Sequence, residues 1–461
     1  MPITKSKLLS LSISCALLAG CGSLTHTTFS PPPVNVPSSW QQQQINESTS
    51  IDPWWLKFND ETLNSLITHV LKNNNDLALA TLTLEKARLK AGLTATDRYP
   101  DISSETTGKK NKDLDSGATD NSFSTSLSIS YELDLWGRVS SEIDAAKWTA
   151  VASEEDREAT AQSLASTTAS LYWQIGYLKD RLRLSSKSID YAKQTLALTK
   201  NQYKSGAVTQ LNVLEAQRSL AGQESSHSEL VQQLHEAENS LAILLGKTPK
   251  PDLAKIDTLP DTNIPEIQAG VPADVLIRRP DVKSALYTMR AALATKDATL
   301  AAYFPTFSLT GSLGGSSTEL HNLLSNPIGT LGANLVLPFL EWNQMKLNEK
   351  ISDIDYQKAV VTYRKTLYEA FEDVDNALSA KTQYDYQAQK LKEQYNAASA
   401  AEKIYASQYR YGAVSIQDWL DAQETQRESE ESLLKNRYNR FNIQATVYQA
   451  LGGVDIATTI K

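Results

Sequence analysis

Few side chains in this sequence are placed to do chemistry. The chain has 461 residues, with five histidines and two cysteines, and it contains no nucleophile motif and no glycine-rich phosphate loop. His227 and His235 are eight residues apart, which on a helix separates them by about 12 Å, too far to share one metal ion. The sequence therefore predicts no catalytic, metal or cofactor site, and we do not expect an enzyme.

Cys21 is the residue with the clearest chemical role. A short positive start (Lys5 and Lys7) precedes an apolar run from Leu8 to Leu18, and the run ends Leu18-Ala19-Gly20-Cys21. Such a run is too short for a membrane-spanning helix and has the length of a signal peptide. The ending resembles a bacterial lipobox, in which the cysteine thiol receives a diacylglycerol and becomes the new N-terminus. We therefore predict a signal peptide over residues 1–20 and lipidation of Cys21.

Charge and hydropathy narrow the class of protein further. The formal net charge is −8, and removal of Lys5 and Lys7 gives −8 − 2 = −10 for the mature chain. A mildly acidic chain without a basic run argues against nucleic acid as a partner. No stretch of 18 apolar residues occurs, so we expect any membrane crossing to be made by strands.

The sequence contains an internal duplication at an offset of about 206 residues. Residues 203–217 and 409–423 share seven identities in fifteen positions, and Trp136 returns as Trp342. The offset far exceeds the 20–50 residues of solenoid repeats. We therefore predict two copies of one half-molecule.

Proline and glycine divide each half into the same helices. Residues from Asn343 to Tyr411 include neither breaker, and a helix over this range would run about 100 Å. Its apolar residues recur at steps of three and four (positions 367, 370, 374, 377, then 384, 388, 391, 395, 398), which indicates coiled-coil packing. The remaining helices are predicted at Val139–Ser205, Ala207–Leu245, Ala413–Leu451, Asp76–Arg98 and Pro280–Ala302.

Four strands are predicted between the short and long helices. Phe123 to Leu133 alternates between apolar and polar residues, and weaker alternation begins at Ile102. The same period appears at Phe307, Leu309 and Leu313 and at Ala333, Leu335, Leu337 and Phe339. Eleven tilted residues span roughly 25 Å, the apolar band of an outer-membrane barrel. Because four strands cannot close a barrel and open edges are not tolerated in lipid, several copies must share one. Three copies give twelve strands, enough for an aqueous bore.

The order of these elements resembles the TolC-type outer-membrane factor family, in its lipoprotein branch of OprM/NodT-like exit ducts. The resemblance covers the whole mature chain. The motifs that carry it are Trp54-Trp55-x-x-Phe58-x-Asp60, Asn74-Asn75-Asp76-Leu77, Arg98-Tyr99-Pro100, Asp134-Leu135-Trp136-Gly137-Arg138, Arg278-Arg279-Pro280-Asp281, Tyr303-Phe304-Pro305 and the paired Tyr-x-x-Gly turns.

The resemblance implies an α+β membrane protein that exports without an energy source of its own. The fold would be a trimer sharing a 12-stranded β-barrel, four strands per chain, continued by a long α-helical coiled-coil periplasmic tunnel. The implied partners are outer-membrane lipid, a periplasmic adaptor and an inner-membrane pump of the resistance-nodulation-division type, with small molecules as cargo. A type I protein secretion duct is the alternative within this class. A structural coiled-coil lipoprotein or adhesin is the alternative outside it, although it leaves the alternating strands unexplained.

The resemblance places adaptor docking at two helix tips. These are Tyr203, Gly206, Ala207, Val208 and Thr209 in the first copy, with Tyr409, Gly412, Ala413, Val414 and Ser415 in the second. A turn between antiparallel helices needs a residue that adopts positive φ, which explains the glycines physically. The glycines could be purely structural, but the repeated Ala-Val pair favours a docking surface.

The resemblance also places a periplasmic gate at Asp418 and Asp421. Their spacing of three puts both on one helical face, and around a threefold axis they would form two carboxylate rings that favour cations. The alternative is a solvated acidic face. The first copy has Asn212 and Glu215 at these positions. Val414 replaces an arginine that ties the closed tips in some relatives, so closure here would rest on packing and on bridges to the aspartates.

These predictions divide the chain into six segments. They are a signal peptide (1–20), a lipid-anchored equatorial segment (21–75), the first repeat (76–246), a proline-rich equatorial join (247–279), the second repeat (280–452) and a C-terminal tail (453–461). The Trp54 region, residues 246–272 of the join and the tail are expected to form a mixed equatorial belt.

Overall fold

The computed structural model describes residues 25–33, 53–249, 256–260, 264–265, 267 and 278–453. The predicted signal peptide and Cys21 lie outside these residues. So do much of the predicted join 247–279 and all of the predicted tail except Gly453.

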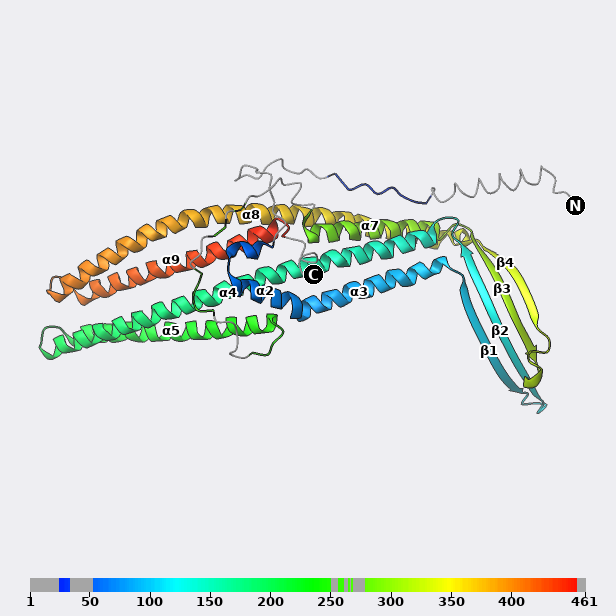
Figure 1. Cartoon of the computed structure of the whole chain (residues 1–461), viewed down its shortest axis with the longest axis horizontal. Coiled ribbons are helices and arrows are strands. Elements are labelled where there is room, and N and C mark those ends of the chain that lie inside the picture. The colour runs from blue at the N-terminus through cyan, green and yellow to red at the C-terminus, as the bar shows by residue number, and fades with distance from the viewer. Residues whose placement is uncertain are drawn as a thin grey trace. The chain divides into compact units, whose positions relative to one another are not determined.

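The described elements repeat one order twice, as the duplication predicts (Figure 1). The first copy comprises α3 (Asn75–Ala95), β1 (Asp101–Lys112), β2 (Thr119–Leu133), α4 (Arg138–Lys204) and α5 (Gln210–Leu244). The second comprises α7 (Pro280–Ala301), β3 (Thr306–Ser317), β4 (Ile328–Val336), α8 (Trp342–Arg410) and α9 (Ile416–Ala450). Two elements precede them, η2 (Trp54–Phe58) and α2 (Glu61–Asn73), and short 3-10 turns follow α3, β3 and β4, namely η3 (Thr96–Arg98), η4 (Leu320–Asn322) and η5 (Pro338–Leu340).

The predicted helices are confirmed, with small shifts at their ends. The helices predicted at Val139–Ser205 and Asn343–Tyr411 each begin and end one residue earlier. The helices that follow the glycine turns begin three residues later than predicted. These helices begin later because Thr209 and Ser415 are their N-caps, and an N-cap residue has an extended rather than a helical backbone.

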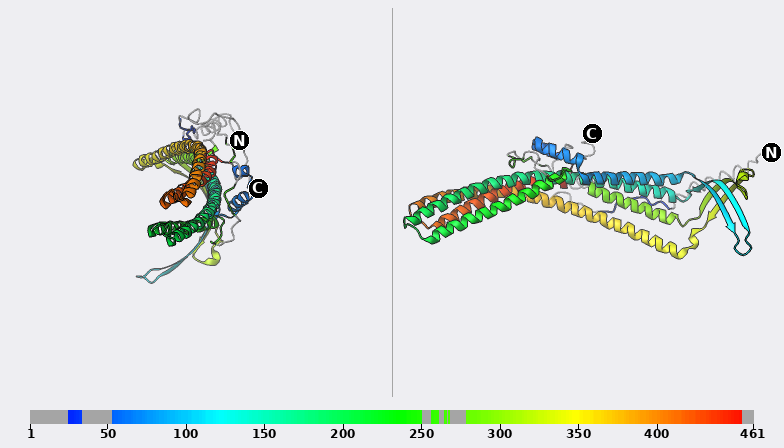
Figure 2. Two further views of the ribbon diagram at one scale, coloured as in Figure 1. Left: turned by 90° about the vertical axis from the view of Figure 1, so that its left-hand side faces the viewer. Right: turned by 90° about the horizontal axis from the view of Figure 1, so that it is seen from below.

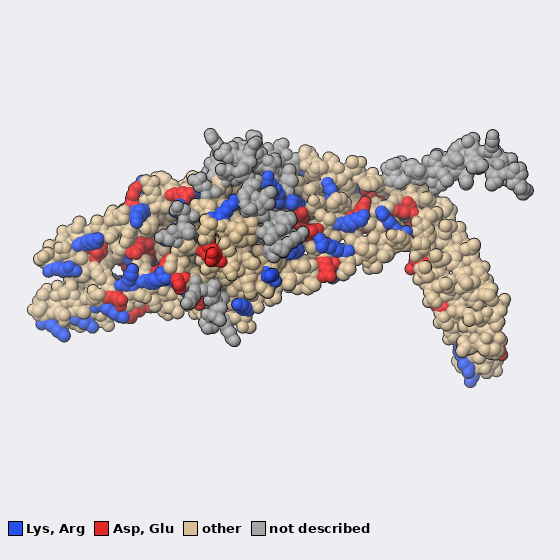
Figure 3. Space-filling model, viewed as in Figure 1, with Lys and Arg blue, Asp and Glu red and all other residues tan. Residues whose placement is uncertain are grey.

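The four strands form one antiparallel sheet in the order β1-β2-β3-β4. Residues opposite one another across the strands share a face, so each face can be described by rows. One face carries the apolar rows Leu127–Leu313–Gly329, Tyr131–Leu309–Ala333 and Leu133–Phe307–Leu335. The other carries polar rows such as Ser103–Ser128–Ser312–Thr330. The visible side of the sheet bears few charges except at its far end (Figure 3). Strand β1 ends in a lysine-rich stretch, Lys109-Lys110-Asn111-Lys112.

The last strand is shorter than its alternation predicts. The pattern continues through Leu337 and Phe339, but β4 ends at Val336 and η5 follows. Pro338 explains the difference, because proline has no N–H to donate to a strand ladder and fixes φ near −65°.

Several of the sequence motifs meet where the sheet joins the helices. The Asp134 carboxylate caps α4 by accepting a hydrogen bond from the Val139 N–H at 3.1 Å. The Trp136 indole donates to the Pro305 carbonyl at 2.8 Å, and its ring stacks on Phe304 at 4.9 Å. These contacts tie the strand ends of the two copies together.

The chain divides into two compact units. The first comprises residues up to 34, 82–154 and 283–366, and holds the sheet with the adjoining parts of α3, α4, α7 and α8. The second comprises residues 35–81, 155–282 and 367–461, and holds α2, α5, α9 and the rest of the long helices. Within the second unit, α4 pairs with α5 and α8 pairs with α9 in every view (Figures 1 and 2).

The main core of the second unit surrounds α2, a helix that the sequence analysis did not predict. The Asp60 carboxylate caps it by accepting from the Leu63 N–H at 3.0 Å, and also accepts the Tyr172 hydroxyl at 2.6 Å. The surrounding core includes Trp54, Trp55, Phe58, Leu63, Ile67, Trp173, Ile256, Leu259 and Phe441. The Trp54 region and the described part of the join therefore pack together, as the predicted belt requires.

Arg279 explains another motif of the sequence. Its guanidinium, which is largely buried, donates to the carboxylates of Asp281 at 2.8 Å and Asp373 at 2.9 Å. It also lies 3.4 and 3.3 Å from the carbonyls of Ala370 and Ala450. One arginine thus joins the start of α7 to α8 and to the end of α9.

Candidate functional site

Both predicted tips are turns of the same form. Gly206 and Gly412 adopt φ of 74° and 73°, the left-handed region that glycine enters without strain. A Cβ added to either glycine would meet no atom within 4 Å, so the backbone conformation, rather than space, requires glycine. In each turn the next residue, Ala207 or Ala413, donates its N–H back to the last helical turn at 2.9 Å.

The two tips present most of their predicted docking residues to solvent. Gly206, Ala207, Thr209, Gly412, Ala413 and Ser415 are exposed, while Val208 and Val414 are half-buried. The two tyrosines differ sharply, since Tyr203 is 47% exposed and Tyr409 only 5%. Tyr409 is therefore a packing residue within the chain, and the docking role predicted for the other residues stays a prediction.

Asp418 sits in the first turn of α9, where it completes a capping box. Its carboxylate accepts from the Ser415 N–H at 3.0 Å and the Ser415 hydroxyl at 2.6 Å, and its own N–H donates to the Ser415 hydroxyl at 3.1 Å. The Ser415 hydroxyl and N–H lower the pKa of Asp418 below its ordinary value. Because the carboxylate also lies at a helix N-terminus, this position suits a permanent negative charge.

Asp421 lies one turn further along the same exposed face of α9. It accepts a hydrogen bond from the Gln417 amide at 2.7 Å. Thr425 and Glu428 continue the exposed face, whereas Trp419 is buried on the other side of the helix. Both predicted gate residues thus point away from the chain's own core and are available to a ring formed by several copies.

A small core beneath the tips holds the α4–α5 and α8–α9 pairs together. It contains Leu196, Ala216, Ala406, Tyr409, Ile416, Trp419 and Leu420, with Val414 packed against it. Trp419 lies at its centre, stacked on Tyr409 at 5.0 Å and edge-on to Tyr191 at 6.1 Å. Val414 therefore contributes apolar packing to this core.

Polar side chains also connect α4 to α8 and α9 at the tips. The Tyr409 hydroxyl donates to Gln202 at 2.6 Å. One carboxylate oxygen of Glu402 accepts both the Tyr191 hydroxyl at 2.6 Å and the Trp419 indole at 3.0 Å. Burial, followed by the bond to Glu402, raises the pKa of Tyr191, so this hydroxyl remains a donor. Of these residues the sequence analysis named only Tyr409; it missed Tyr191, Gln202, Glu402 and Trp419, because they belong to no motif and their partners across the helix pairs are distant in sequence.

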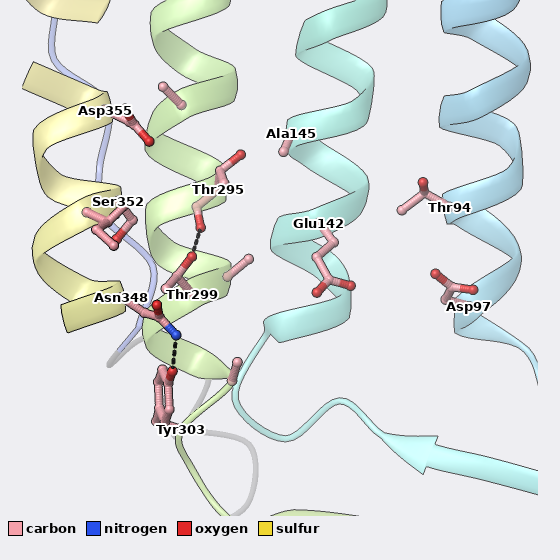
Figure 4. Close-up of a pocket in the computed structure, with 14 residues that line it drawn as sticks. Thr94, Asp97, Glu142, Ala145, Thr295, Thr299, Tyr303, Asn348, Ser352 and Asp355 are labelled. Carbon is pink, nitrogen blue, oxygen red and sulfur yellow. Dashed lines mark hydrogen bonds between the residues drawn. The ribbon is translucent and has the colours of Figure 1, made fainter. Parts of the chain in front are cut away.

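A second surface of interest is an open cavity of about 940 Å³ in the first unit (Figure 4). Its lining comes from α3, α4, α7 and α8 and consists mainly of Ala, Ser and Thr, with the carboxylates of Asp97, Glu142 and Asp355. Tyr303 and Asn348 close one end through a hydrogen bond of 2.6 Å. Glu142 is paired with Arg138 at 2.9 Å. Its lining thus mixes small apolar side chains with hydroxyl, amide and carboxylate groups.

The described residues show neither a metal-binding cluster nor a membrane-spanning helix. They contain no group of three or more side chains placed to hold a metal ion. None of the helices described has both the length and the apolar character needed to cross a bilayer.

Comparison with known proteins decides the family. Two stretches of the chain, residues 66–247 and 271–453, match outer membrane efflux proteins. The chain belongs to this family. The two stretches correspond to the two copies of the duplication, and membership assigns this outer membrane efflux protein to export across the outer membrane, as the resemblance implied.

Individual relatives agree over almost the whole chain. The efflux protein is 30% identical to the probable efflux pump outer membrane protein TtgC of Pseudomonas putida, over 98% of this chain and 96% of that one. It is 30% identical to toxin and drug export protein A of Aggregatibacter actinomycetemcomitans, over 90% and 91%. The open state of the Neisseria gonorrhoeae MtrE outer membrane channel matches its structure with a TM-score of 0.82 and 27% identity, covering 93% of this chain and 97% of that one. The predicted fold class and the predicted export function are therefore confirmed.

Proposed function

We propose that three copies of this chain form the passive exit channel of a tripartite efflux system, with an adaptor and an energised inner-membrane pump as partners. The observation that carries the proposal is the two-faced sheet. Four leucines of one face are each at least half exposed in the single chain, namely Leu127, Leu309, Leu313 and Leu335. Lipid would cover that face, and the Ser and Thr rows of the other would line a water-filled lumen.

The open edges of the chain support assembly of several copies. Strands β1 and β4 are the edges of the sheet, and unpaired edges are excluded from lipid. In Figure 4 the residues of α8, α7, α4 and α3 follow one another in that order, so α3 and α8 are the edges of the helical layer. The edge strands and the edge helices can therefore both be covered by another copy of the chain.

The helical edges carry unpartnered apolar stripes. On α3, Leu82, Leu89 and Leu93 are exposed; on α8, Leu347, Ile351, Ile354 and Val361 are exposed. Their spacing approximates the seven-residue repeat of a coiled coil. If α3 of one copy packs on α8 of the next, the contact is head-to-tail, and such contacts give a ring when the rotation from copy to copy closes. Three copies give twelve strands, whereas two would give eight strands with a lumen filled by side chains.

The remaining features fit a duct. The cavity of the first unit would belong to the inner wall of the duct. The exposed tips would meet the adaptor. The rings of Asp418 and Asp421 would form the periplasmic constriction of the duct. A resistance-nodulation-division pump would supply the energy, and cargo would be small molecules. Relatives named for toxin, drug and toluene export support this range of cargo.

The oligomeric state tests this proposal directly. We expect the detergent-solubilised protein to have the native mass of three chains and to conduct ions in planar bilayers without any energy source. A stable folded monomer, or a dimer, would contradict the shared barrel.

Lipidation of Cys21 gives a separate prediction. We expect wild-type protein to incorporate labelled palmitate in cells and Cys21→Ser to incorporate none and to retain its signal peptide. Partial function should survive, because the barrel supplies a second membrane anchor. Equal labelling of mutant and wild type would show that the lipobox interpretation is wrong.

A further inference from the structure

Residues 25–29 contact the first unit chiefly through Thr25, Thr27 and Phe29, and the His26 ring also lies 3.8 Å from the Asp297 carboxylate. The Thr25 hydroxyl donates to the Trp136 carbonyl. Thr27 donates to the Asp297 carboxylate twice, from its N–H at 2.8 Å and from its hydroxyl at 2.7 Å. The Phe29 ring lies 4.4 Å from the Arg290 guanidinium. Alternate residues of an extended segment share a face, so the side chains of Thr25, Thr27 and Phe29 can contact one surface together.

The receiving surface is built for this segment. Arg290 and Asp297 are seven residues apart on α7, two helical turns, and so lie on one face. Arg290 also lies 4.6 Å from the Trp148 ring, so its guanidinium makes cation–π contacts with two aromatic rings. Asp297 is only 4% exposed. A buried carboxylate needs hydrogen-bond donors, and Thr27 provides two.

The attachment point has a consequence for the predicted lipid. Thr25 contacts Trp136, which lies between the end of β2 and the start of α4. Three residues lie between Cys21 and Thr25, and the four steps along the chain from one to the other span at most about 14 Å. An acyl group on Cys21 would therefore be tethered close to the end of the strands, where a barrel meets the membrane surface.

We propose that residues 25–29 are a clasp that fixes the lipid-bearing N-terminus at the junction of sheet and helices, with Asp297 as its positioning residue. This inference rests on the lipidation proposed above. The clasp would hold the acyl chains in the bilayer beside the strands of their own chain, before and after those strands join a shared barrel. The clasp acts through these non-covalent contacts alone, and no covalent bond forms or breaks.

Cysteine accessibility tests the contacts of the clasp. Thr25 is buried and Thr28 exposed, so we expect Thr25→Cys to react with maleimide at least tenfold more slowly than Thr28→Cys. Adding Asp297→Ala to Thr25→Cys should bring its rate close to that of Thr28→Cys, and Thr27→Val should act in the same direction. Asp355→Ala, an exposed acid of the same unit, is the matched control and should change nothing. Equal rates at positions 25 and 28, or no effect of Asp297→Ala, would overturn the clasp.

An epistasis experiment tests the link to the lipid. A lipid-free version would carry a conventional cleavable signal and serine at position 21. We expect Asp297→Ala to lower the yield of assembled oligomer severalfold in the lipidated protein and to cause no further loss in the lipid-free version. Equal losses in both would overturn the positioning role. If wild type fails to take up palmitate, the lipidation proposal fails, whereas the accessibility result still decides whether the clasp exists.

Discussion

Changing Asp418 and Asp421 together to alanine is expected to remove most of the cation preference of the reconstituted channel. In the proposed trimer six carboxylates converge on one constriction. Carboxylates a few ångströms apart repel one another by about 1 kcal/mol or more per pair at moderate dielectric, so the ring should attract cations. A free-energy difference of about 1 kcal/mol corresponds to about a fivefold change in the occupancy of the ring by cations. We also expect the double mutant to lose block by multivalent cations added on the periplasmic side.

Asparagine is the more informative replacement at these positions. Asp418 helps to cap α9, so alanine would remove a structural contact together with the charge. The first copy shows that asparagine fits: Asn212 accepts from the Thr209 N–H at 3.0 Å and its hydroxyl at 2.8 Å in the same capping box. The double change to asparagine should therefore keep the tip folded and still abolish selectivity.

The comparison with Glu215 completes this test. Glu215 stands in the first copy where Asp421 stands in the second, and its replacement by glutamine should do less than either aspartate change. Unchanged selectivity and unchanged block in the double asparagine variant would show that Asp418 and Asp421 are a solvated helix face.

The regular parts of the fold could be predicted because their signals are local and repeated. Uninterrupted helical periodicity located α4 and α8, and the positive φ of Gly206 and Gly412 follows from the need to reverse the chain. Helix α2 was missed although its signals are present, with Asp60 as N-cap and buried Leu63, Ile67 and Val70 at helical spacing. The sequence analysis placed this region in the mixed equatorial belt and assigned no helix to it.

The tip tyrosines show what local sequence does not determine. Tyr203 and Tyr409 occupy the same place in equivalent turns, yet only Tyr409 is buried. It stacks on Trp419, whereas the first copy has Val213 at the matching position. The clasp was equally hidden, since Thr27 and Asp297 are 270 residues apart. Such contacts depend on tertiary packing, which no single motif records.

A carboxylate placed in either apolar stripe is expected to abolish the oligomer. Leu89→Asp on α3 and Ile354→Asp on α8 would each bury an unpaired charge in every interface of the ring, at a cost of several kcal/mol per copy. Both positions are exposed in the single chain, so each chain should keep its helical content by circular dichroism. Thr149→Asp on α4 is the matched control, because Thr149 is an exposed polar residue of a helix that lies inside the layer rather than at its edge (Figure 4). It should leave the native mass at three chains, while the two stripe variants should run as monomers that do not conduct. If both stripe variants retained the mass of three chains, α3 and α8 could not be the edges that join the copies.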